Sequence, residues 1–394
     1  MLWICLCCSS AALAKSESKP DRFPPNPLEM TTPDPLLPRP VGKQKQPLNL
    51  LEILNLATAL NNLNIQATAQ LQAGDRVGAF ATWNRELRLR RALGLLEEVK
   101  ALGRVGAIAW SENQRQELQL ITGRLQTIQQ QTQPQSAVVN LELLQALGQA
   151  YQQVRSPQQA LEVYQQILLA ERWRRDPVAQ EATLKTIAEL ALVWFDYPKA
   201  TATYQQLLDL ARTKGDHISE LADLQQLAYI YDQAKQPQQA VAIKQQLAEI
   251  YFKEKKLNQL PLLKLAIASD YESLNQQEQA FRNYQEAYTT AWSLQEYYRA
   301  SEALQHLVKL YRSQDQLDEA LRTSQILLQA DEQTSNYYGM MTTYDQIGQI
   351  YIKRRSYPNA KVAFENGLKI AKQLQYQETY FVQQISQVNQ RISK

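Results

Sequence analysis

Few residues in this chain are of types that carry out catalysis or bind metals. The 394-residue sequence contains two histidines, His217 and His306, and three cysteines, Cys5, Cys7 and Cys8. The histidines are too far apart in sequence for a histidine-based metal cluster. The cysteines all precede residue 9, so the rest of the chain has no disulfide, thiolate zinc site or cysteine nucleophile. The sequence also lacks a glycine-rich phosphate loop, a GxSxG motif and an HExxH motif. We therefore predict that the protein is not an enzyme and holds no metal or cofactor.

The charge pattern gives little support for nucleic-acid binding. Basic residues number 42 and acidic residues 39, for a formal net charge of +3. The densest basic cluster, Arg85, Arg88, Arg90 and Arg91, has none of the interleaved aromatic residues typical of nucleic-acid sites. It is interpreted either as a patch for an anion or acidic partner, or as a solvated helix face with local pairs such as Glu86 with Arg90. We predict no nucleic-acid partner.

The first fourteen residues are typical of an export signal. An apolar run from Leu2 to Leu13 ends in Ala12-Leu13-Ala14, the small-x-small pattern that signal peptidases cut. No basic residue precedes the run, so an apolar tail on a cytosolic protein is the alternative. The run is too short to span a bilayer, which needs roughly 20 residues. We predict a signal peptide over residues 1–14, export to a periplasm, lumen or extracellular space, and no integral membrane span.

Residues 15–47 are rich in proline. Such a density of prolines sustains neither a helix nor a sheet ladder, so we predict a disordered, extended linker that acts as a spacer. Nine of the 16 prolines lie in it: Pro20, Pro24, Pro25, Pro27, Pro33, Pro35, Pro38, Pro40 and Pro47.

From residue 140 onward the sequence repeats with a period of 40 residues. Each repeat has a reference alanine: Ala160, Ala200, Ala240, Ala280, Ala320 and Ala360. Four residues later comes a position, here called the slot, that is mostly aromatic: Tyr164, Tyr204, Lys244, Tyr284, Ser324 and Phe364. Twelve residues before the alanine comes a mostly small residue, the small position: Gly148, Ala188, Ala228, Ala268, Val308 and Gly348.

The spacing predicts a pair of antiparallel helices in each repeat. In the first helix, apolar residues recur three and four apart and so share one face. The small position lets a neighbouring helix approach closely, and the reference alanine opens the second helix. Pro157, Pro198, Pro237 and Pro358 precede their alanines by two or three residues, where proline is tolerated in a first helical turn.

The repeats resemble the tetratricopeptide repeat, although their period exceeds the family's usual 34 residues. The resemblance covers about 141–380 and implies an all-α fold, a right-handed superhelical solenoid of antiparallel helix pairs. It assigns six repeats and a C-terminal capping helix to residues 136–394. In the first repeat the family's apolar, small and aromatic positions fall on Leu144, Leu147, Gly148, Tyr151, Ala160 and Tyr164.

Residues 48–135 are helical in pattern but less regular. Ala79 and Trp83 have the spacing of Ala160 and Tyr164. Because terminal repeats are expected to be atypical, we predict two degenerate capping repeats in this region. It is similar to the amino-terminal part of tetratricopeptide proteins of cyanobacteria.

The family resemblance also implies where a ligand binds. The first helix of each pair lines a concave groove, and only Lys309 with Arg312 approaches a cluster that grips a carboxylate. We therefore expect contacts mainly through amides and tyrosine, with the convex face as the alternative. The lining positions fall on Gln145, Gln149, Gln152, Lys185, Glu189, Gln225, Tyr229, Asp232, Ser269, Glu272, Gln305, Lys309, Arg312, Asp345, Gln349 and Ile352.

These observations favour a binding protein whose partner is another protein or a peptide segment. The leading prediction is an exported scaffold or assembly adaptor. Two alternatives are a cytosolic sensor or regulator of a peptide or small ligand, and an accessory subunit of an enzyme. Self-association is a further option if the last helix, from Tyr376 to Ile392, exposes Phe381 and Ile385.

Overall fold

The computed structural model describes residues 26–30, 33–37, 48–132 and 140–393. The predicted signal peptide, residues 1–14, lies outside the described residues. Within them are 17 α-helices, two short 3-10 helices and no strand, which confirms the all-α fold class. None of these helices is both long and apolar enough to cross a membrane. The chain separates into two compact units, residues 1–183 (unit 1) and 184–394 (unit 2).

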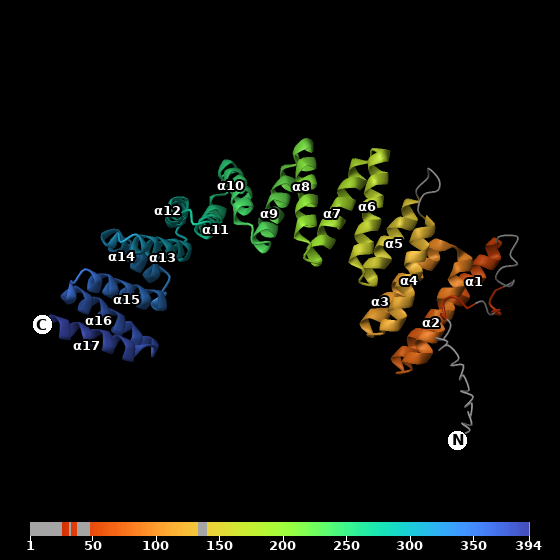
Figure 1. The fold of residues 1–394 in the computed structure, drawn as a ribbon, viewed down its shortest axis with the longest axis horizontal. Helices are drawn as coiled ribbons and strands as arrows, with labels where there is room; N and C mark the ends of the chain where they lie inside the picture. Colours follow the sequence, from red (N-terminus) through yellow and green to blue (C-terminus); the bar gives the residue numbers. More distant parts are fainter. Residues whose placement is uncertain (1–25, 31–32, 38–47, 133–139, 394) are drawn as a thin grey trace, which may run out of the picture. The chain divides into compact units, whose positions relative to one another are not determined.

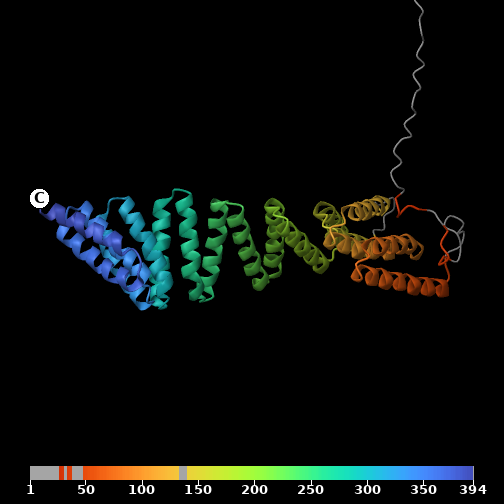
Figure 2. The same cartoon turned by 90° about the horizontal axis from the view of Figure 1, so that it is seen from below.

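Consecutive helices in each unit run antiparallel and form hairpins (Figure 1), which are seen from below in Figure 2. Unit 1 contains α1 (Leu50–Gln72), α2 (Arg76–Arg90), η1 (Arg91–Leu93), α3 (Leu95–Ser111), α4 (Arg115–Thr132), α5 (Leu141–Gln153) and α6 (Pro157–Arg174). The helix α7 (Pro177–Val193) begins in unit 1 and ends in unit 2. Unit 2 continues with α8 (Tyr197–Lys214), α9 (His217–Gln233), α10 (Pro237–Lys253), η2 (Leu257–Gln259), α11 (Leu260–Ser273), α12 (Gln277–Ser293), α13 (Tyr297–Ser313), α14 (Leu317–Gln333), α15 (Tyr337–Lys353), α16 (Tyr357–Leu374) and α17 (Glu378–Ile392).

The repeats pack as their periodic residues predict. Every reference alanine from Ala160 to Ala360 is fully buried, and all the slot residues are buried too. The small positions lie against them, since a Cβ added at Gly148 would come within 2.9 Å of the Tyr164 ring. The prediction of close packing at the small positions is therefore confirmed.

The helices of the repeats end in a common turn. From Arg155 to Gln375 a residue with left-handed backbone occurs every 20 residues, and among these only Gly215 is a glycine. The amide after it donates to the carbonyl five residues back, as Ser156 N does to Tyr151 O at 2.9 Å. This is the Schellman arrangement that satisfies carbonyls at a helix end. In α9, α10, α13 and α14, 17-residue helices alternate with three-residue turns, which accounts for the period of 40.

The helices α1 to α4 form two less regular hairpins. Ala79 and Trp83 are fully buried, as their spacing predicted. The sequence did not indicate that α5, besides pairing with α6, packs as extensively against α3 and far less against α4. Two glycines of α3 make this approach possible. A Cβ at Gly103 would lie 3.0 Å from the Ala150 Cα, and one at Gly106 would clash with the next turn of α5.

Part of the predicted linker is folded onto α1 and α2. Residues 26–30 and 33–37, which we call the strap, form two turns in which Leu28 and Leu37 are buried. For these residues the prediction of an extended, disordered spacer is wrong. Each turn begins with an Asx-Pro pair that preorganises it, and each turn buries one leucine side chain.

The arginine cluster of α2 is neither a free anion patch nor a solvated helix face. Arg90 is buried and pairs with Glu86 at 3.1 Å, as the spacing predicted. Arg85 and Arg91 pair with Asp34 and Glu29 of the strap. All these cations are therefore used inside unit 1.

The last helix closes unit 2 rather than offering Phe381 for stacking. Phe381 is 1% exposed, and its ring fills the space above Gly367 of α16. The prediction of an exposed Phe381 is wrong, because the missing side chain at Gly367 lets the ring pack inward. Ile385 is half-buried, and Val382 and Ile392 are the exposed aliphatic residues of this helix.

Candidate functional site

The predicted groove residues all lie on first helices of the pairs, and none of them is buried. Gln145, Gln149 and Gln152 lie on α5 in unit 1, and Lys185 and Glu189 lie on α7. The others define the groove face of unit 2: Gln225, Tyr229, Asp232, Ser269, Glu272, Gln305, Lys309, Arg312, Asp345, Gln349 and Ile352. The internal contacts of these side chains decide which of them are available to a ligand.

The last groove position of a repeat contacts the slot residue twelve positions later. In the first repeat Gln152 Nε2 donates to the Tyr164 hydroxyl at 3.1 Å. In the fourth repeat the Tyr284 hydroxyl donates to Glu272 Oε2 at 2.6 Å. The polar tip of the buried slot side chain is thus satisfied by the groove residue above it, as buried polar groups require. Gln152 and Glu272 are therefore already hydrogen-bonded to slot residues of their own repeats.

The third repeat has a lysine in the slot. Lys244 is 5% exposed, and its Nζ donates to Asp232 at 2.7 Å and to Asp270 of α11 at 2.8 Å. Burial raises the pKa of Asp270, and the Lys244 ammonium offsets that rise only in part. The three charges lie in the wall of a 530 Å³ pocket. Because this ammonium is shared by two carboxylates, it ties α9, α10 and α11 together.

Glu272 collects polar groups from two later helices. Besides the Tyr284 hydroxyl, His306 Nδ1 lies 3.3 Å from its Oε2 and Lys309 Nζ lies 3.4 Å from its Oε1. The His306 ring stacks on Tyr284 with centroids 4.5 Å apart, so His306 packs against the slot residue. Burial alone would raise the pKa of Glu272, but these neighbours hold it below its usual value.

The fifth repeat leaves its last groove residue without an internal partner. Its slot residue is Ser324, which is fully buried and whose Oγ has no hydrogen-bond partner among the described residues. Val308 at the small position takes up space that a glycine or alanine leaves to a slot ring elsewhere. Arg312, twelve residues before Ser324, is exposed, and its guanidinium makes no hydrogen bond or ion pair with the described residues.

Arg312 lines a pocket of 370 Å³ between α13 and α15, which we call the basic pocket. Lys309 and Lys353 line it too, and both are largely exposed. They pair with Glu272 and Asp315, respectively, at the surface. Three cations around one hollow suit a carboxylate or another anionic group, and the guanidinium fork can hold it with two hydrogen bonds.

The sixth repeat is closed by α17. The Tyr380 hydroxyl donates to Asp345 Oδ1 at 2.9 Å, and Gln349 Nε2 donates to the Tyr380 hydroxyl at 3.3 Å. Ile352 packs on the core cluster that contains the slot residue Phe364. An apolar groove residue thus accompanies an apolar slot residue.

Residues 143–178, which cover most of the α5–α6 hairpin, match the family model of the tetratricopeptide repeat. The α5–α6 hairpin is a tetratricopeptide repeat, and the later helix pairs repeat its pattern of residues. Their helices carry the reference alanine, slot and small position in one register through both units.

Solved structures similar to this chain include BtubC (BKLC) from P. vanneervenii, at 19% identity over 57% of this chain and 91% of that chain, with a TM-score of 0.38. MamA is similar at 15% identity over 49% of this chain and 92% of its own, with a TM-score of 0.35. Aspartyl phosphate phosphatase F from Bacillus subtilis is 14% identical over 75% of this chain and 78% of its own, with a TM-score of 0.38. No curated protein matches the sequence. Likenesses of this size say nothing about function, and the resemblance to cyanobacterial proteins stays a prediction.

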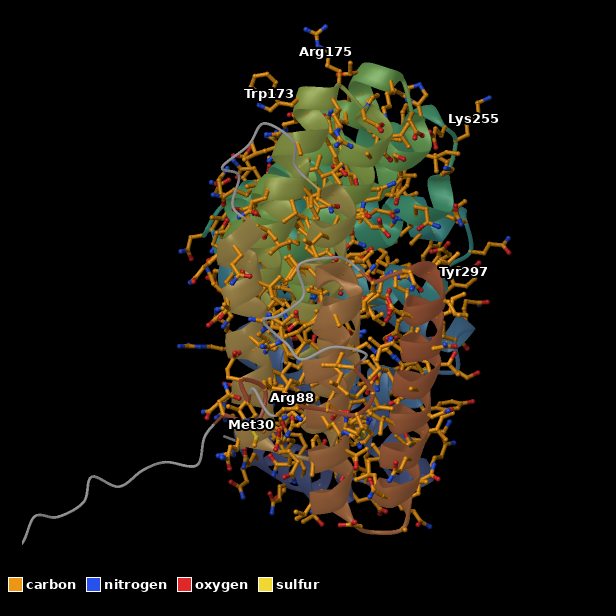
Figure 3. All side chains as sticks on the ribbon, turned by 90° about the vertical axis from the view of Figure 1, so that its right-hand side faces the viewer. Met30, Arg88, Trp173, Arg175, Lys255 and Tyr297 are labelled. Carbon is orange, nitrogen blue, oxygen red and sulfur yellow. The ribbon has the colours of Figure 1, made fainter. Side chains whose placement is uncertain are left out.

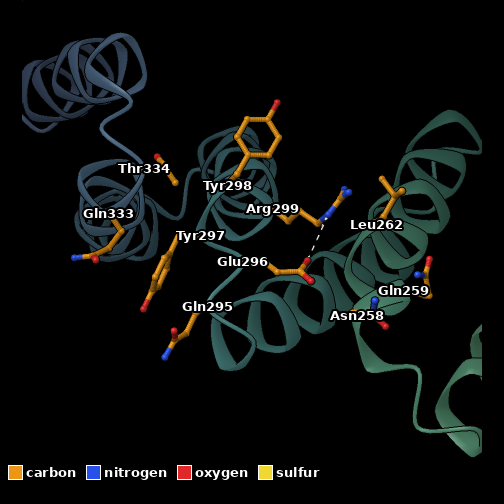
Figure 4. A pocket seen from close by; sticks show the side chains of 10 residues that line it. All are labelled: Asn258, Gln259, Leu262, Gln295, Glu296, Tyr297, Tyr298, Arg299, Gln333 and Thr334. Carbon is orange, nitrogen blue, oxygen red and sulfur yellow. Dashed lines mark ion pairs between the residues drawn. The ribbon is translucent and has the colours of Figure 1, made fainter.

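A further hollow lies where two tetratricopeptide repeats meet at their turns. It measures 670 Å³ and is lined by Leu262, Tyr297 and Tyr298 among others (Figure 4). Its two charged residues, Glu296 and Arg299, pair with each other at 3.4 Å. None of the predicted groove residues lines it, and it has no excess of one charge.

The tetratricopeptide pattern located Lys309 and Arg312 but missed Lys353 and the internal pairing. Lys353 follows the lining position Ile352, so a family-based list passes over it. The only sequence signal for the pairing of groove and slot residues was that a group able to pair stands twelve residues before the slot. Asp232 stands before Lys244 in this way, and Glu272 before Tyr284. Over the described ranges no three His, Cys, Asp or Glu side chains are placed to hold a metal ion.

Proposed function

We propose that the groove face of unit 2 binds an extended or helical segment of another protein, and that Arg312 in the basic pocket holds an acidic group of that segment. The tetratricopeptide match supports a protein-interaction role for the array. The observation that carries the proposal is the unpaired guanidinium of Arg312 above the buried serine at position 324.

The repeat architecture itself explains why this position binds a ligand. In the third and fourth repeats the equivalent residues, Asp232 and Glu272, are held by Lys244 and Tyr284. A ligand carboxylate would be repelled by those two carboxylates, whereas at Arg312 it gains a charge-assisted pair without breaking any internal contact. The exposed Lys309 beside it adds long-range attraction and raises the association rate more than the affinity.

The rest of the segment contacts neutral groups. Tyr229 is 53% exposed, and Ser269 and Gln305 are exposed on the same face. Gln225 Nε2 donates to the Tyr251 hydroxyl at 2.8 Å, and its side-chain carbonyl oxygen can accept a hydrogen bond from a backbone amide of the ligand. Tyrosine and amide side chains suit an extended backbone whose own hydrogen bonds need partners.

The test is affinity capture with the tagged full chain and three baits: wild type, Arg312→Ala and the control Arg282→Ala. Arg282 is exposed on the second helix α12 and pairs only within its own helix, with Glu278. We expect at least one captured protein to be lost about tenfold with Arg312→Ala, equivalent to about 1.4 kcal/mol, and retained with Arg282→Ala. Identical capture by all three baits would contradict the proposal.

A second variant closes the site from inside. Val308→Ala with Ser324→Tyr restores the small residue and slot ring that the other repeats use, and it gives Arg312 a hydroxyl neighbour. We expect this double variant to fold and to lose the same captured protein. Retained capture in a folded double variant would mean that Arg312 does not need to be unpaired to bind.

We also propose that the protein works after export, as an assembly scaffold. The apolar run and the Ala12-Leu13-Ala14 site support this. Mass spectrometry of the amino terminus of the protein isolated from its own cells tests it. A chain that starts at Lys15 and captures envelope proteins agrees with export. An intact Met1 with cytosolic partners would instead favour a sensor or regulator.

A further inference from the structure

One face of α2 recognises the strap through three arginines spaced three residues apart. Arg85 makes a two-pronged contact with Asp34, with Nε to Oδ2 at 2.7 Å and Nη2 to Oδ1 at 2.9 Å. Arg88 Nη1 donates to the Pro27 carbonyl at 3.2 Å. Figure 3 labels Met30 of the strap beside this arginine. The fork geometry of guanidinium makes such contacts selective for a carboxylate or carbonyl in one orientation.

A third contact lies at the end of the same face. Arg91 donates to the Glu29 carboxylate at 3.0 and 3.2 Å, while its Nε donates to the buried Glu98 at 2.9 Å. Arg124 of α4 borders the same carboxylate of Glu29 at 4.0 Å. The arginine face of α2, meaning Arg85 and Arg88 of α2 with Arg91 at the start of η1, therefore binds two acidic side chains and a carbonyl.

The strap presents one motif twice. Asn26 Oδ1 accepts from Leu28 N at 2.9 Å, and Asp34 Oδ1 accepts from Leu36 N at 3.0 Å. In both turns the carbonyl of the first residue also accepts from the amide three residues on, at 2.9 and 3.0 Å. An Asx-Pro pair followed by leucine thus builds the same turn at residues 26–29 and 34–37. The two turns share these hydrogen bonds, but the buried leucine is the third residue of the first turn, Leu28, and the fourth residue of the second, Leu37.

Each turn buries one leucine. Leu28 is 1% exposed, and Leu37 packs into the cluster of Leu56, Leu60 and Leu89 from α1 and α2. The proline-rich chain has few conformations to lose on docking, which lowers the entropic cost. The strap therefore binds as a preorganised peptide ligand does, with leucine anchors and flanking ion pairs.

We propose that the arginine face of α2 and its leucine seats form a second peptide-binding site, which the strap occupies in cis and which a partner segment with an acidic Asx-Pro-Leu turn occupies by displacing the strap. The contacts are of a kind that can exchange, since Arg85 is 38% exposed and Glu29 is 53% exposed. The site lies within unit 1 and involves none of the groove residues of unit 2.

Because the strap belongs to the same chain, a partner segment must compete with its effective concentration at the site. Ten residues, 38–47, separate the strap from residue 48. A short tether of this kind gives an effective concentration in the millimolar range. A free partner segment at micromolar concentration therefore binds only where it makes better contacts, or where the strap is modified or removed.

The test is binding of a fluorescein-labelled peptide of residues 26–37 to the full chain. The strap-disabled variant carries Leu28→Asp and Asp34→Ala, which remove one anchor and the two-pronged contact. We expect it to bind the peptide at least about tenfold more tightly than wild type, whose own strap competes. Adding Arg85→Ala to the disabled variant should abolish that gain. A peptide with both acidic residues replaced by alanine should not bind to any of the three.

Two results would overturn the proposal. One is a strap-disabled variant that keeps its circular dichroism spectrum and binds the peptide no better than wild type. The other is binding that Arg85→Ala leaves unchanged. If the disabled variant does not fold, hydrogen exchange of the wild-type chain decides. We expect the amides of Leu28 and Leu37 to exchange faster when excess peptide is added. Strap amides that stay as protected as those of α2 would show a fixed element of the fold.

Discussion

The hairpins of α1 to α4 and those of unit 2 share one architecture but are held together differently. In α1 to α4 buried carboxylates bridge neighbouring helices. Glu86 of α2 is fully buried and pairs with Arg90 at 3.1 Å and with Arg104 of α3 at 2.7 Å. Glu98 of α3 is held in the same way by Arg124 of α4 at 2.6 Å.

In unit 2 the corresponding layers are mostly alanine and aromatic. Ala280, Tyr284 and Ala287 of α12 are all fully buried in one cluster, and the slot hydroxyl alone needs a polar partner. A repeat has a similar neighbour on each side, so one packing solution serves every junction. Before the first hairpins, the described residues form the strap and not a helix pair. The hairpins of α1 to α4 are held together by buried ion pairs and by the strap. Their packing therefore depends on particular residue pairs and not on a repeated sequence pattern.

The largest expected effect separates the two kinds of junction. Glu86→Ala leaves Arg90 and Arg104 without their buried counter-ion, and we expect a loss of about 3–5 kcal/mol in the free energy of unfolding by urea. The control is Glu97→Ala, which removes an exposed partner 3.4 Å from Arg90 and should cost less than about 1 kcal/mol. Equal effects would mean that the network adds no more than surface pairs do.

The second prediction concerns the one repeat that resembles the ion network. Lys244→Ala leaves Asp232 and Asp270 facing each other without the ammonium. We expect a loss of about 2 kcal/mol, less than for Glu86 because Asp232 is 41% exposed. Lys264→Ala, which removes a pair with the exposed Glu286, is the matched control and should cost about 0.5 kcal/mol. If Lys244→Ala lowers the free energy of unfolding no more than the control does, the charges of this repeat add no more stability than the neutral slots of the other repeats.

The third prediction uses pH to probe a buried acid in unit 2. Burial raises the pKa of Asp331, which accepts from Ser301 Oγ at 2.6 Å and has an Oδ2 with no partner among the described residues. Between the unfolded pKa of about 3.9 and the raised folded value, the folded state binds more protons than the unfolded state. The free energy of unfolding therefore falls as pH rises through this interval.

Asp331→Asn should remove this pH dependence, which amounts to about 1.4 kcal/mol in the free energy of unfolding for each unit of pKa shift. Glu86→Ala should keep it. Thermal unfolding from pH 4 to 8 measures it. A wild-type slope that persists in Asp331→Asn would assign the pH dependence to other groups.

The smallest effect tests the common turn of the repeats. Lys255 and Gly215 occupy equivalent left-handed positions, with φ of 57° and 67°. Lys255→Gly should stabilise by about 0.5–1 kcal/mol and Gly215→Ala should destabilise by about 1 kcal/mol, because only glycine adopts this conformation without strain. The melting temperatures of both variants check this. Changes of the same sign would mean that the two turns differ.

The sequence located the packing of the repeats well because that packing is local. The reference alanines and slots are buried as the period required, and Pro157 and Pro237 occupy the first turns of their helices. Partners within a hairpin lie at fixed separations along the chain, such as Gly148 and Tyr164. A regular register therefore carries that information directly.

The candidate site was predicted only as a set of positions. The sequence placed Asp232, Glu272 and Arg312 in equivalent positions but did not show that only Arg312 is unpaired. That difference depends on whether a buried side chain on another helix needs a partner. Lys244 and Tyr284 do, whereas the shorter Ser324 does not reach the groove.

The sequence by itself determined the helix pairs, their turns and the face on which groove residues lie, because each follows from side chains a few turns apart on one hairpin. The tertiary structure decided which charged side chains are paired within the protein. Asp34 and Arg85 meet across 51 residues, and Lys244 and Asp270 across 26. Such partners are chosen by packing of separate elements, and the availability of a charged group depends on all of its neighbours at once.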